Sequence, residues 1–220
     1  MTAPDGLAVR DSGQRHHTSG DHEDGQGDER HSSPEAAAME TCLRLLTAAP
    51  RTRAQLDQAL RRRQVPQQAA DAVLGRLARA GLINDTVFAK AWVESRHHGR
   101  GLARRALTAE LRQRGVADDD VRDAIAELSP EQEEAAARRL VTAKLATTRG
   151  RPLDTRVRRL VGLLARKGYP PGMAYRVVRE ALEQEKTDTG DSGMDGMDIE
   201  AIIDAQAVPE DEPLTEEDSI

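Results

Sequence analysis

The feature that most constrains this chain is a short phrase that occurs three times at nearly constant spacing. Its copies read LRRRQV, LRQRGV and LARKGY, at residues 60–65, 111–116 and 164–169. The first two copies are 51 residues apart, and the last two are 53 apart. Self-similarity at a period of this length is typical of repeat proteins, in which each unit buries its apolar face only against its neighbours. The sequence therefore predicts a stack of repeated units.

The pattern around the middle copy is helical. Within residues 99–116, Ala103, Leu107 and Leu111 recur at i, i+4 and i+8 on one stripe, which predicts one amphipathic helix. Gly115 follows its last turn, where a positive φ favours glycine. No stretch alternates with a period of two. We therefore predict an all-α fold of tandem three-helix repeats that forms an elongated, curved module with disordered acidic tails.

The equivalent position in the first repeat departs from this pattern. Gln64 stands where Gly115 and Gly168 stand in the later copies. Because a side chain disfavours positive φ, we expect the first helix end to be strained or differently shaped.

Charge divides the chain into three segments. Residues 1–34 carry a net charge of −4, residues 35–186 carry +10, and residues 187–220 carry −12 with no Lys or Arg. The two ends have a disordered composition, and the basic middle is long enough to bury a core. We expect the repeat units of the middle segment to span about 35–98, 99–150 and 151–186.

Residues with N-cap chemistry stand where the helical patterns begin. Ser33, Asn84 and Ser129 precede helical stretches, and Thr52 and Gln55 have the spacing of a capping box. For the helix that contains Leu160 and Leu164, we expect Asp154 or Thr155 as the cap.

Catalytic motifs are not found. The sequence contains no phosphate-binding P-loop, no dinucleotide fingerprint in a strand-to-helix context and no G-x-S-x-G. We interpret Cys42 as a small core residue and expect no catalytic, cofactor-binding or metal-binding residues, including among the histidines of residues 16–31. No apolar run approaches membrane-spanning length. We therefore expect a protein of the cytoplasm that is not an enzyme.

The arrangement of arginines is the main remaining sequence feature that indicates a function. They surround the middle helix and recur on the equivalent helix of the third unit. A run of charge is often only a solvated face, but repetition at equivalent positions favours a cationic surface that grips carboxylates or phosphates. The candidate partner-binding residues are Arg96, Arg100, Arg104, Arg105, Arg112, Arg114, Arg158, Arg159, Arg166 and Lys167.

Three stretches together resemble the RecX family of recombination regulators. They are GLINDTVFAKAWVESR at 81–96, RRALTAELRQRGV at 104–116 and LLARKGYPPGMAYRVV at 163–178. The resemblance implies tandem three-helix repeats that bind the RecA recombinase in the groove of its filament on single-stranded DNA. It also implies inhibition of the ATPase, strand-exchange and coprotease activities of RecA. By the same resemblance Asp85, Phe88, Trp92 and Arg96 are motif positions, with Phe88 and Trp92 mainly in the core.

Two alternatives stay open. A helical module that binds single- or double-stranded DNA without sequence preference would use the same cationic face, with a steep dependence on salt. An enzyme is a distant third. We expect a monomer that does not contact a membrane. For the C-terminal tail, the alternatives to simple solubilisation are an acidic segment that covers the basic face and a docking segment around Ile199, Ile202 and Ile203.

Overall fold

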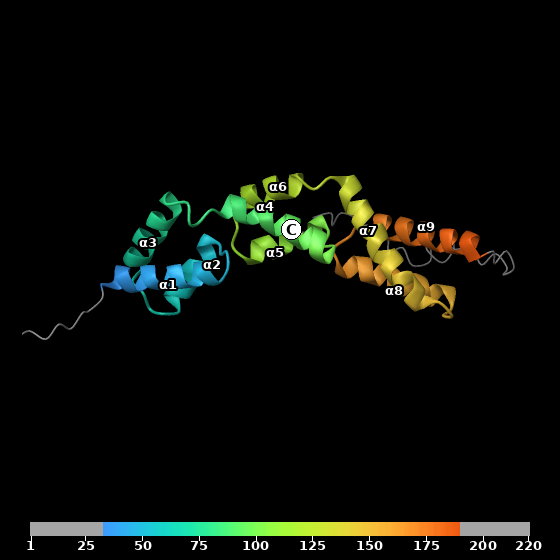
Figure 1. Cartoon of the computed structure of the whole chain (residues 1–220), viewed down its shortest axis with the longest axis horizontal. Helices are drawn as coiled ribbons and strands as arrows, with labels where there is room; N and C mark the ends of the chain where they lie inside the picture. Colours follow the sequence, from blue (N-terminus) through green and yellow to red (C-terminus); the bar gives the residue numbers. More distant parts are fainter. Residues whose placement is uncertain (1–32, 190–220) are drawn as a thin grey trace, which may run out of the picture. The chain divides into compact units, whose positions relative to one another are not determined.

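The computed structural model describes residues 33–189, which form helices joined by short turns and loops and contain no strand (Figure 1). This confirms the all-α fold class. The helices are α1 (Pro34–Ala48), α2 (Arg53–Arg61), α3 (Gln67–Arg79), α4 (Asp85–Arg100), α5 (Arg104–Gln113), α6 (Asp118–Ala126), α7 (Pro130–Leu145), a single 3₁₀ turn (Ala146–Thr148), α8 (Leu153–Arg166) and α9 (Pro171–Thr189).

Four helix starts, those of α1, α2, α4 and α7, follow from the capping residues. The Oγ of Ser33 accepts from the Ala36 amide, and the side chains of Asn84 and Ser129 cap α4 and α7 in the same way. Thr52 and Gln55 form the expected reciprocal capping box at the start of α2. Such caps satisfy amides that have no partner inside the helix.

Two boundaries differ from the expectation. The N-cap of α8 is Pro152, without a side-chain hydrogen bond, and Asp154 and Thr155 lie within the first turn. The predicted single helix over 99–116 is shorter, because α4 continues through Arg100 and ends at Gly101, which has a φ of +61°. Glycine reaches this left-handed conformation without a Cβ penalty, so it ends α4 and separates it from α5.

Three separate apolar clusters define the repeat units. Cys42, Leu56 and Leu74 belong to the first cluster, built from α1, α2 and α3. The second joins α4, α5 and α6, and the third joins α7, α8 and α9. We call these groups of three helices the first, second and third units. The unit boundaries therefore lie near residues 80–84 and 127–129, whereas we had expected them near 98 and 150, because α4 packs with the helices that follow it.

Neighbouring units are joined by hydrogen bonds at equivalent positions of the repeat. The hydroxyl of Thr52 donates to the carbonyl of Arg114 at 2.7 Å, and the amide of Ala103 donates to the carbonyl of Lys167 at 2.9 Å. Thr52 and Ala103 are 51 residues apart, and the two accepting residues are 53 apart, as in the sequence repeat. In each case the helix start of one unit touches the end of the second helix in the next unit.

Glycine is required at this contact. Gly115 and Gly168 have φ values of +75° and +88°, and a Cβ on them would lie 2.4 Å from the Ala54 Cβ and 2.6 Å from the Ala106 amide nitrogen. Gln64 has the same left-handed conformation, with a φ of +58°, but it is exposed and belongs to the first unit. No described unit precedes that one, so the Gln64 side chain is tolerated there. The helix end keeps the common shape and is strained only by its positive φ.

No helix within residues 33–189 is both long enough and apolar enough to cross a membrane.

Candidate partner-binding surface

The ten cations expected at the site fall into two groups. Six of them are exposed: Arg100, Arg105, Arg112, Arg158, Arg159 and Arg166. The other four are half-buried and make contacts inside the protein: Arg96, Arg104, Arg114 and Lys167. The structure therefore separates cations that can meet a partner from cations that hold the units together.

Arg96 and Arg114 enclose the ring of Trp92. Their guanidinium carbons lie 4.0 and 3.7 Å from its centroid. The Trp92 Nε1 donates to Glu110 at 2.8 Å, and Arg96 approaches the same carboxylate at 3.6 Å. Burial lowers the pKa of Arg114, which partly offsets its favourable position over the ring. This stack belongs to the second unit and makes Arg96 and Arg114 structural cations.

Arg104 and Lys167 brace the junction of the second and third units. The side chain of Arg104 donates to the Leu128 carbonyl, and its backbone amide donates to the buried Glu133 carboxylate at 2.9 Å. The Lys167 ammonium donates to the Arg100 carbonyl at 2.7 Å. Because α5 has no side-chain cap of its own, Glu133 takes that role from α7.

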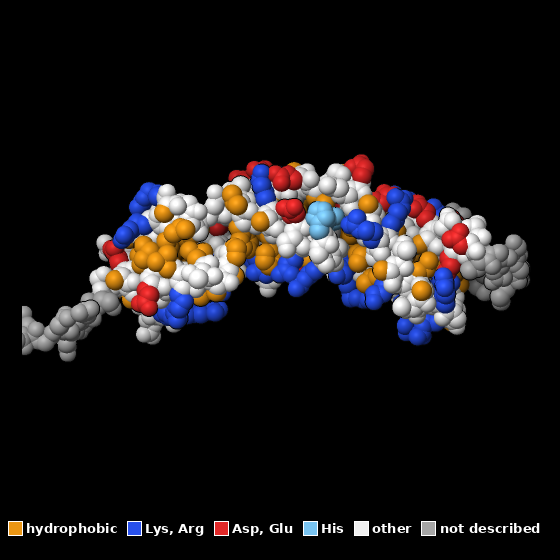
Figure 2. All heavy atoms as spheres, in the orientation of Figure 1, with side chains coloured by type: hydrophobic (Ala, Val, Ile, Leu, Met, Phe, Trp, Pro, Cys, Tyr) orange, Lys and Arg blue, Asp and Glu red, His pale blue; other side chains and the backbone are white. Residues whose placement is uncertain are grey.

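Each unit has a group of exposed cations on its second helix or beside it, in addition to exposed cations on other helices. In Figure 2, Lys and Arg side chains line the lower edge over α2, α5 and α8, and others lie over α3, α6 and α7, where Asp and Glu side chains are also seen. We call the following set the basic surface: Arg61, Arg62 and Arg63 in the first unit, Arg100, Arg105 and Arg112 in the second, and Arg158, Arg159 and Arg166 in the third.

Ion pairs on the basic surface do not neutralise it. Arg112 pairs with Asp118 at 2.8 Å and Arg158 with Asp154 at 3.7 Å, and all four side chains are well exposed. Arg61 also pairs with Asp57 at 2.8 Å, and there the arginine is exposed but the carboxylate is half-buried. Exposed pairs of this kind contribute at most about 1 kcal/mol, so an anionic partner can displace them.

Arg61, Arg62 and Arg63 were missing from the set predicted from sequence. They occupy the same place in the repeat as residues 112–114 and 165–167. The 51-residue offset that defines the repeat was therefore a sufficient signal to include them.

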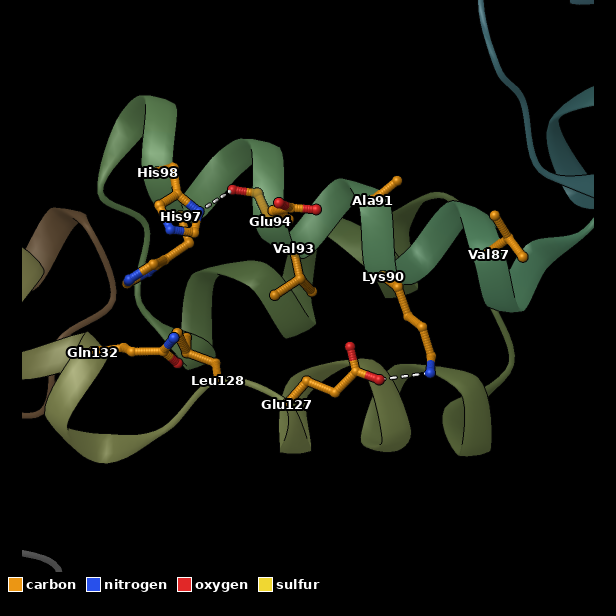
Figure 3. A pocket seen from close by; sticks show the side chains of 10 residues that line it. All are labelled: Val87, Lys90, Ala91, Val93, Glu94, His97, His98, Glu127, Leu128 and Gln132. Carbon is orange, nitrogen blue, oxygen red and sulfur yellow. Dashed lines mark hydrogen bonds and ion pairs between the residues drawn. The ribbon is translucent and has the colours of Figure 1, made fainter.

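A second feature is a hollow of about 420 Å³ beside α4, α6 and α7 (Figure 3). Lys90 pairs with Glu127 across it at 2.5 Å. The Nδ1 of the buried His97 lies 2.9 Å from the Leu102 carbonyl, so this ring nitrogen donates, as expected for a histidine that satisfies a carbonyl at a helix end. The hollow is lined by side chains of both charge signs, and α4 contributes most of its lining.

Two observations concern the metal-ligating and thiol side chains of the described residues. Residues 33–189 contain no group of three or more His, Cys, Asp or Glu that could hold a metal ion. Cys42 is buried, and burial raises the pKa of its thiol, which disfavours the reactive thiolate. The histidines of residues 16–31 and the segment around Ile199 lie outside the described residues.

An arginine-rich surface of this kind binds anions. Guanidinium groups stay charged at all physiological pH values and grip carboxylates or phosphates through paired hydrogen bonds. They supply no proton acceptor near neutral pH. The geometry therefore suits recognition of an extended anionic partner.

The chain is similar to known proteins over its described helices. Residues 38–77 match the first three-helix domain of RecX, and residues 84–125 match the second. A regulatory protein RecX from Thermobifida fusca is 64% identical over 150 residues, which cover 68% of this chain and 81% of that protein. One from Streptomyces coelicolor is 58% identical over 163 residues, covering 74% of this chain and 87% of the relative.

Solved structures show the same fold. A crystal structure of RecX from Lactobacillus salivarius superposes with a TM-score of 0.61 at 16% identity, covering 67% of this chain and 96% of that one. A crystal structure of another regulatory protein RecX gives a TM-score of 0.59 at 22% identity, covering 67% and 72%. The arrangement of three-helix units is therefore shared at low sequence identity.

Proposed function

The chain belongs to the RecX family of regulatory proteins, and on that premise we propose that it binds the RecA recombinase filament on single-stranded DNA. In this proposal it acts in the cytoplasm and inhibits the ATPase, strand-exchange and coprotease activities of RecA. It acts by binding and catalyses no reaction.

The observation that carries the proposal is the repetition of the basic surface. Each unit has exposed arginines on or beside its second helix, and three repeat positions carry one in two of the three units. These pairs are Arg61 and Arg112, Arg62 and Arg166, and Arg105 and Arg158. A filament also repeats, so a stack of units with similar cationic side chains can make several equivalent contacts with it. Linked contacts strengthen one another through effective concentration, even when each is weak.

The test is RecA ATP hydrolysis on single-stranded DNA, with this protein titrated at fixed salt and with excess DNA. The variant Arg105→Ala, Arg158→Ala, Arg159→Ala removes three exposed cations of the basic surface. We expect it to need at least tenfold more protein for half inhibition.

A matched control removes three exposed, ion-paired arginines outside the basic surface. The variant Arg122→Ala, Arg138→Ala, Arg176→Ala changes the net charge equally. It should inhibit like the parent protein. If both triple variants lose inhibition equally, only net charge matters and the proposed surface is wrong.

The second candidate is direct, sequence-independent binding of DNA, which the cationic character of the same surface favours. Binding to naked DNA would then fall steeply as salt rises, and it would need no RecA. If the protein leaves RecA hydrolysis unchanged but binds naked DNA with that dependence, the second candidate replaces the first.

A further inference from the structure

An apolar groove lies between the first unit and α4, and none of the residues that line it belongs to the basic surface. Pro50 and Leu82 contribute to one side, and Val87, Phe88 and Trp92 contribute to the other. The hollow has a volume of about 450 Å³. Phe88 and Trp92 stack with their centroids 5.6 Å apart, so the second side has a firm aromatic wall.

Two side chains at the groove are exposed in a way that packing does not explain. Leu82 is 53% exposed and Val87 is 61% exposed. Within the described residues, Leu43 is the only other large hydrophobic side chain that is exposed, at 42%. Two of three such residues thus lie at one hollow, which is typical of a surface that a partner covers.

The groove also has a cationic end. Arg51 lines it, and no Asp or Glu does among the described residues. The Nε of Arg51 is buried and has no hydrogen-bond partner in the described part of the chain. A buried donor without a partner is unfavourable, and a carboxylate is its best acceptor. The fitting occupant therefore combines bulky aliphatic side chains with acidic ones.

One segment of this chain has that composition. Residues 195–208 read DGMDIEAIIDAQAV, with Ile199, Ile202 and Ile203 at the i, i+3, i+4 spacing of one helix face. Four acidic residues accompany them and no basic one does. This segment lies outside the described residues, and the function proposed above does not use it.

We infer that residues 195–208 of one chain dock in the apolar groove of a second copy, with the isoleucines against Leu82 and Val87 and a carboxylate on Arg51. Charge complementarity and apolar match identify the occupant. The inference does not depend on the proposed function, because it concerns a different surface and needs no RecA.

The length of the chain argues for a second copy. The third unit meets Gly101, at the end of α4, through the Tyr169 hydroxyl. From there α9 continues away from α4 (Figure 1), and at 1.5 Å per residue its 19 residues are about 28 Å long. By the same rise, Val87 in the groove lies about 20 Å back along α4 from Gly101. Ten residues separate Thr189 from Ile199, and they reach at most about 35 Å. Residues 195–208 therefore cannot reach the groove of their own chain. In a pair of chains, each segment can instead bind in the groove of the other copy.

The assay uses Trp92, the single tryptophan of the chain, which lines the groove. The full-length chain carrying Ile199→Asp, Ile202→Asp and Ile203→Asp presents an empty groove. A synthetic peptide of residues 195–208, which has no aromatic residue, is then titrated into it. We expect a saturable blue shift of the Trp92 emission, because the isoleucines displace water from the indole.

Two exposed positions provide the matched controls. Val87→Glu in the groove should weaken peptide binding at least tenfold, and Leu43→Glu in α1 should leave it unchanged. Neither side chain is buried, so both variants should keep the helical content of the parent. A peptide that leaves the emission unchanged would overturn the inference, as would equal weakening by both substitutions.

Sedimentation equilibrium then tests the exchange between copies. The average mass of the wild-type chain should rise toward a dimer with concentration, and the triple isoleucine variant should remain monomeric. A wild-type chain with a blue-shifted Trp92 that stays monomeric at all concentrations would show docking within one chain and refute the second copy.

Discussion

Replacing Gly115 by alanine should weaken the contact between the first and second units. The substitution places a side chain at a φ of +75°, which costs about 1–2 kcal/mol for a non-glycine residue. Its Cβ would also lie 2.4 Å from the Ala54 Cβ, well inside van der Waals contact. Overpacking of this kind costs about 1–3 kcal/mol. The reduced freedom of the unfolded chain returns about 0.4–1 kcal/mol. We expect a net loss of about 2–3 kcal/mol in the free energy of unfolding.

The measurement is equilibrium unfolding in urea followed by circular dichroism, with Trp92 emission as a local reporter. Trp92 is informative because Arg114, the residue before Gly115, covers its ring. Gly81→Ala is the control, since Gly81 has a φ of +73° but no atom within 4 Å of its added Cβ. It should lose only about 0.5–1 kcal/mol, the difference between the backbone and unfolded-chain contributions.

A second substitution isolates the clash. Ala54→Gly removes the only atom within 3.4 Å of the new Cβ. Combined with Gly115→Ala, it should recover about 1–2 kcal/mol as a coupling energy in a double-mutant cycle. If Gly115→Ala is no more destabilising than Gly81→Ala, or if Ala54→Gly gives no recovery, the junction between the units does not depend on this contact.

Three further predictions concern buried polar groups. Burial raises the pKa of Tyr169 to about 12. The contribution of the neutral Tyr169 side chain to stability is therefore complete below pH 10 and is lost as pH rises toward 12. Absorbance titration at 295 nm of the Tyr175→Phe variant, in which Tyr169 is the only tyrosine, should show this late ionisation. Burial alone would raise the pKa of Glu185, but hydrogen bonds from two arginines hold it below the ordinary 4.5. The stabilisation by ionised Glu185 is therefore present above pH 4.5 and is lost as pH falls through the folded-state pKa. In the Glu185→Gln variant, the free energy of unfolding measured in urea should depend less on pH in that acid range. Thr52→Ala removes both a helix cap and the bond to the next unit, and should cost about 2 kcal/mol in the same urea assay, whereas Thr52→Ser should keep most of it.

The sequence predicted those local structures that depend only on residues close together in the chain. The Thr52 capping box, the Ser129 cap and the positive φ of Gly115 depend on residues within one turn, so the local sequence was enough to predict them. Asp154 failed as a predicted cap because Pro152 already sets an extended backbone one residue before α8. The division into units failed for a different reason, since the packing of α4 depends on residues far along the chain.

The candidate surface shows the same limit. Exposed arginines such as Arg105 and Arg158 could be predicted from the repeat, because equivalent positions share an environment. The contact of Arg96 and Arg114 with the Trp92 ring could not be predicted from the sequence. An arginine in a helical pattern looks the same in the sequence whether its side chain faces solvent or an aromatic ring.

By itself, the sequence determined the helices, their caps, the threefold repeat and the cationic character of the middle segment, because each depends on near neighbours or on a period. Only the tertiary structure decided which helices share a core, why Gly115 and Gly168 cannot carry a side chain while Gln64 can, and which cations are free to meet a partner. These properties depend on distances between residues far apart in the sequence, such as Ala54 and Gly115, and such distances exist only once the helices and units are packed.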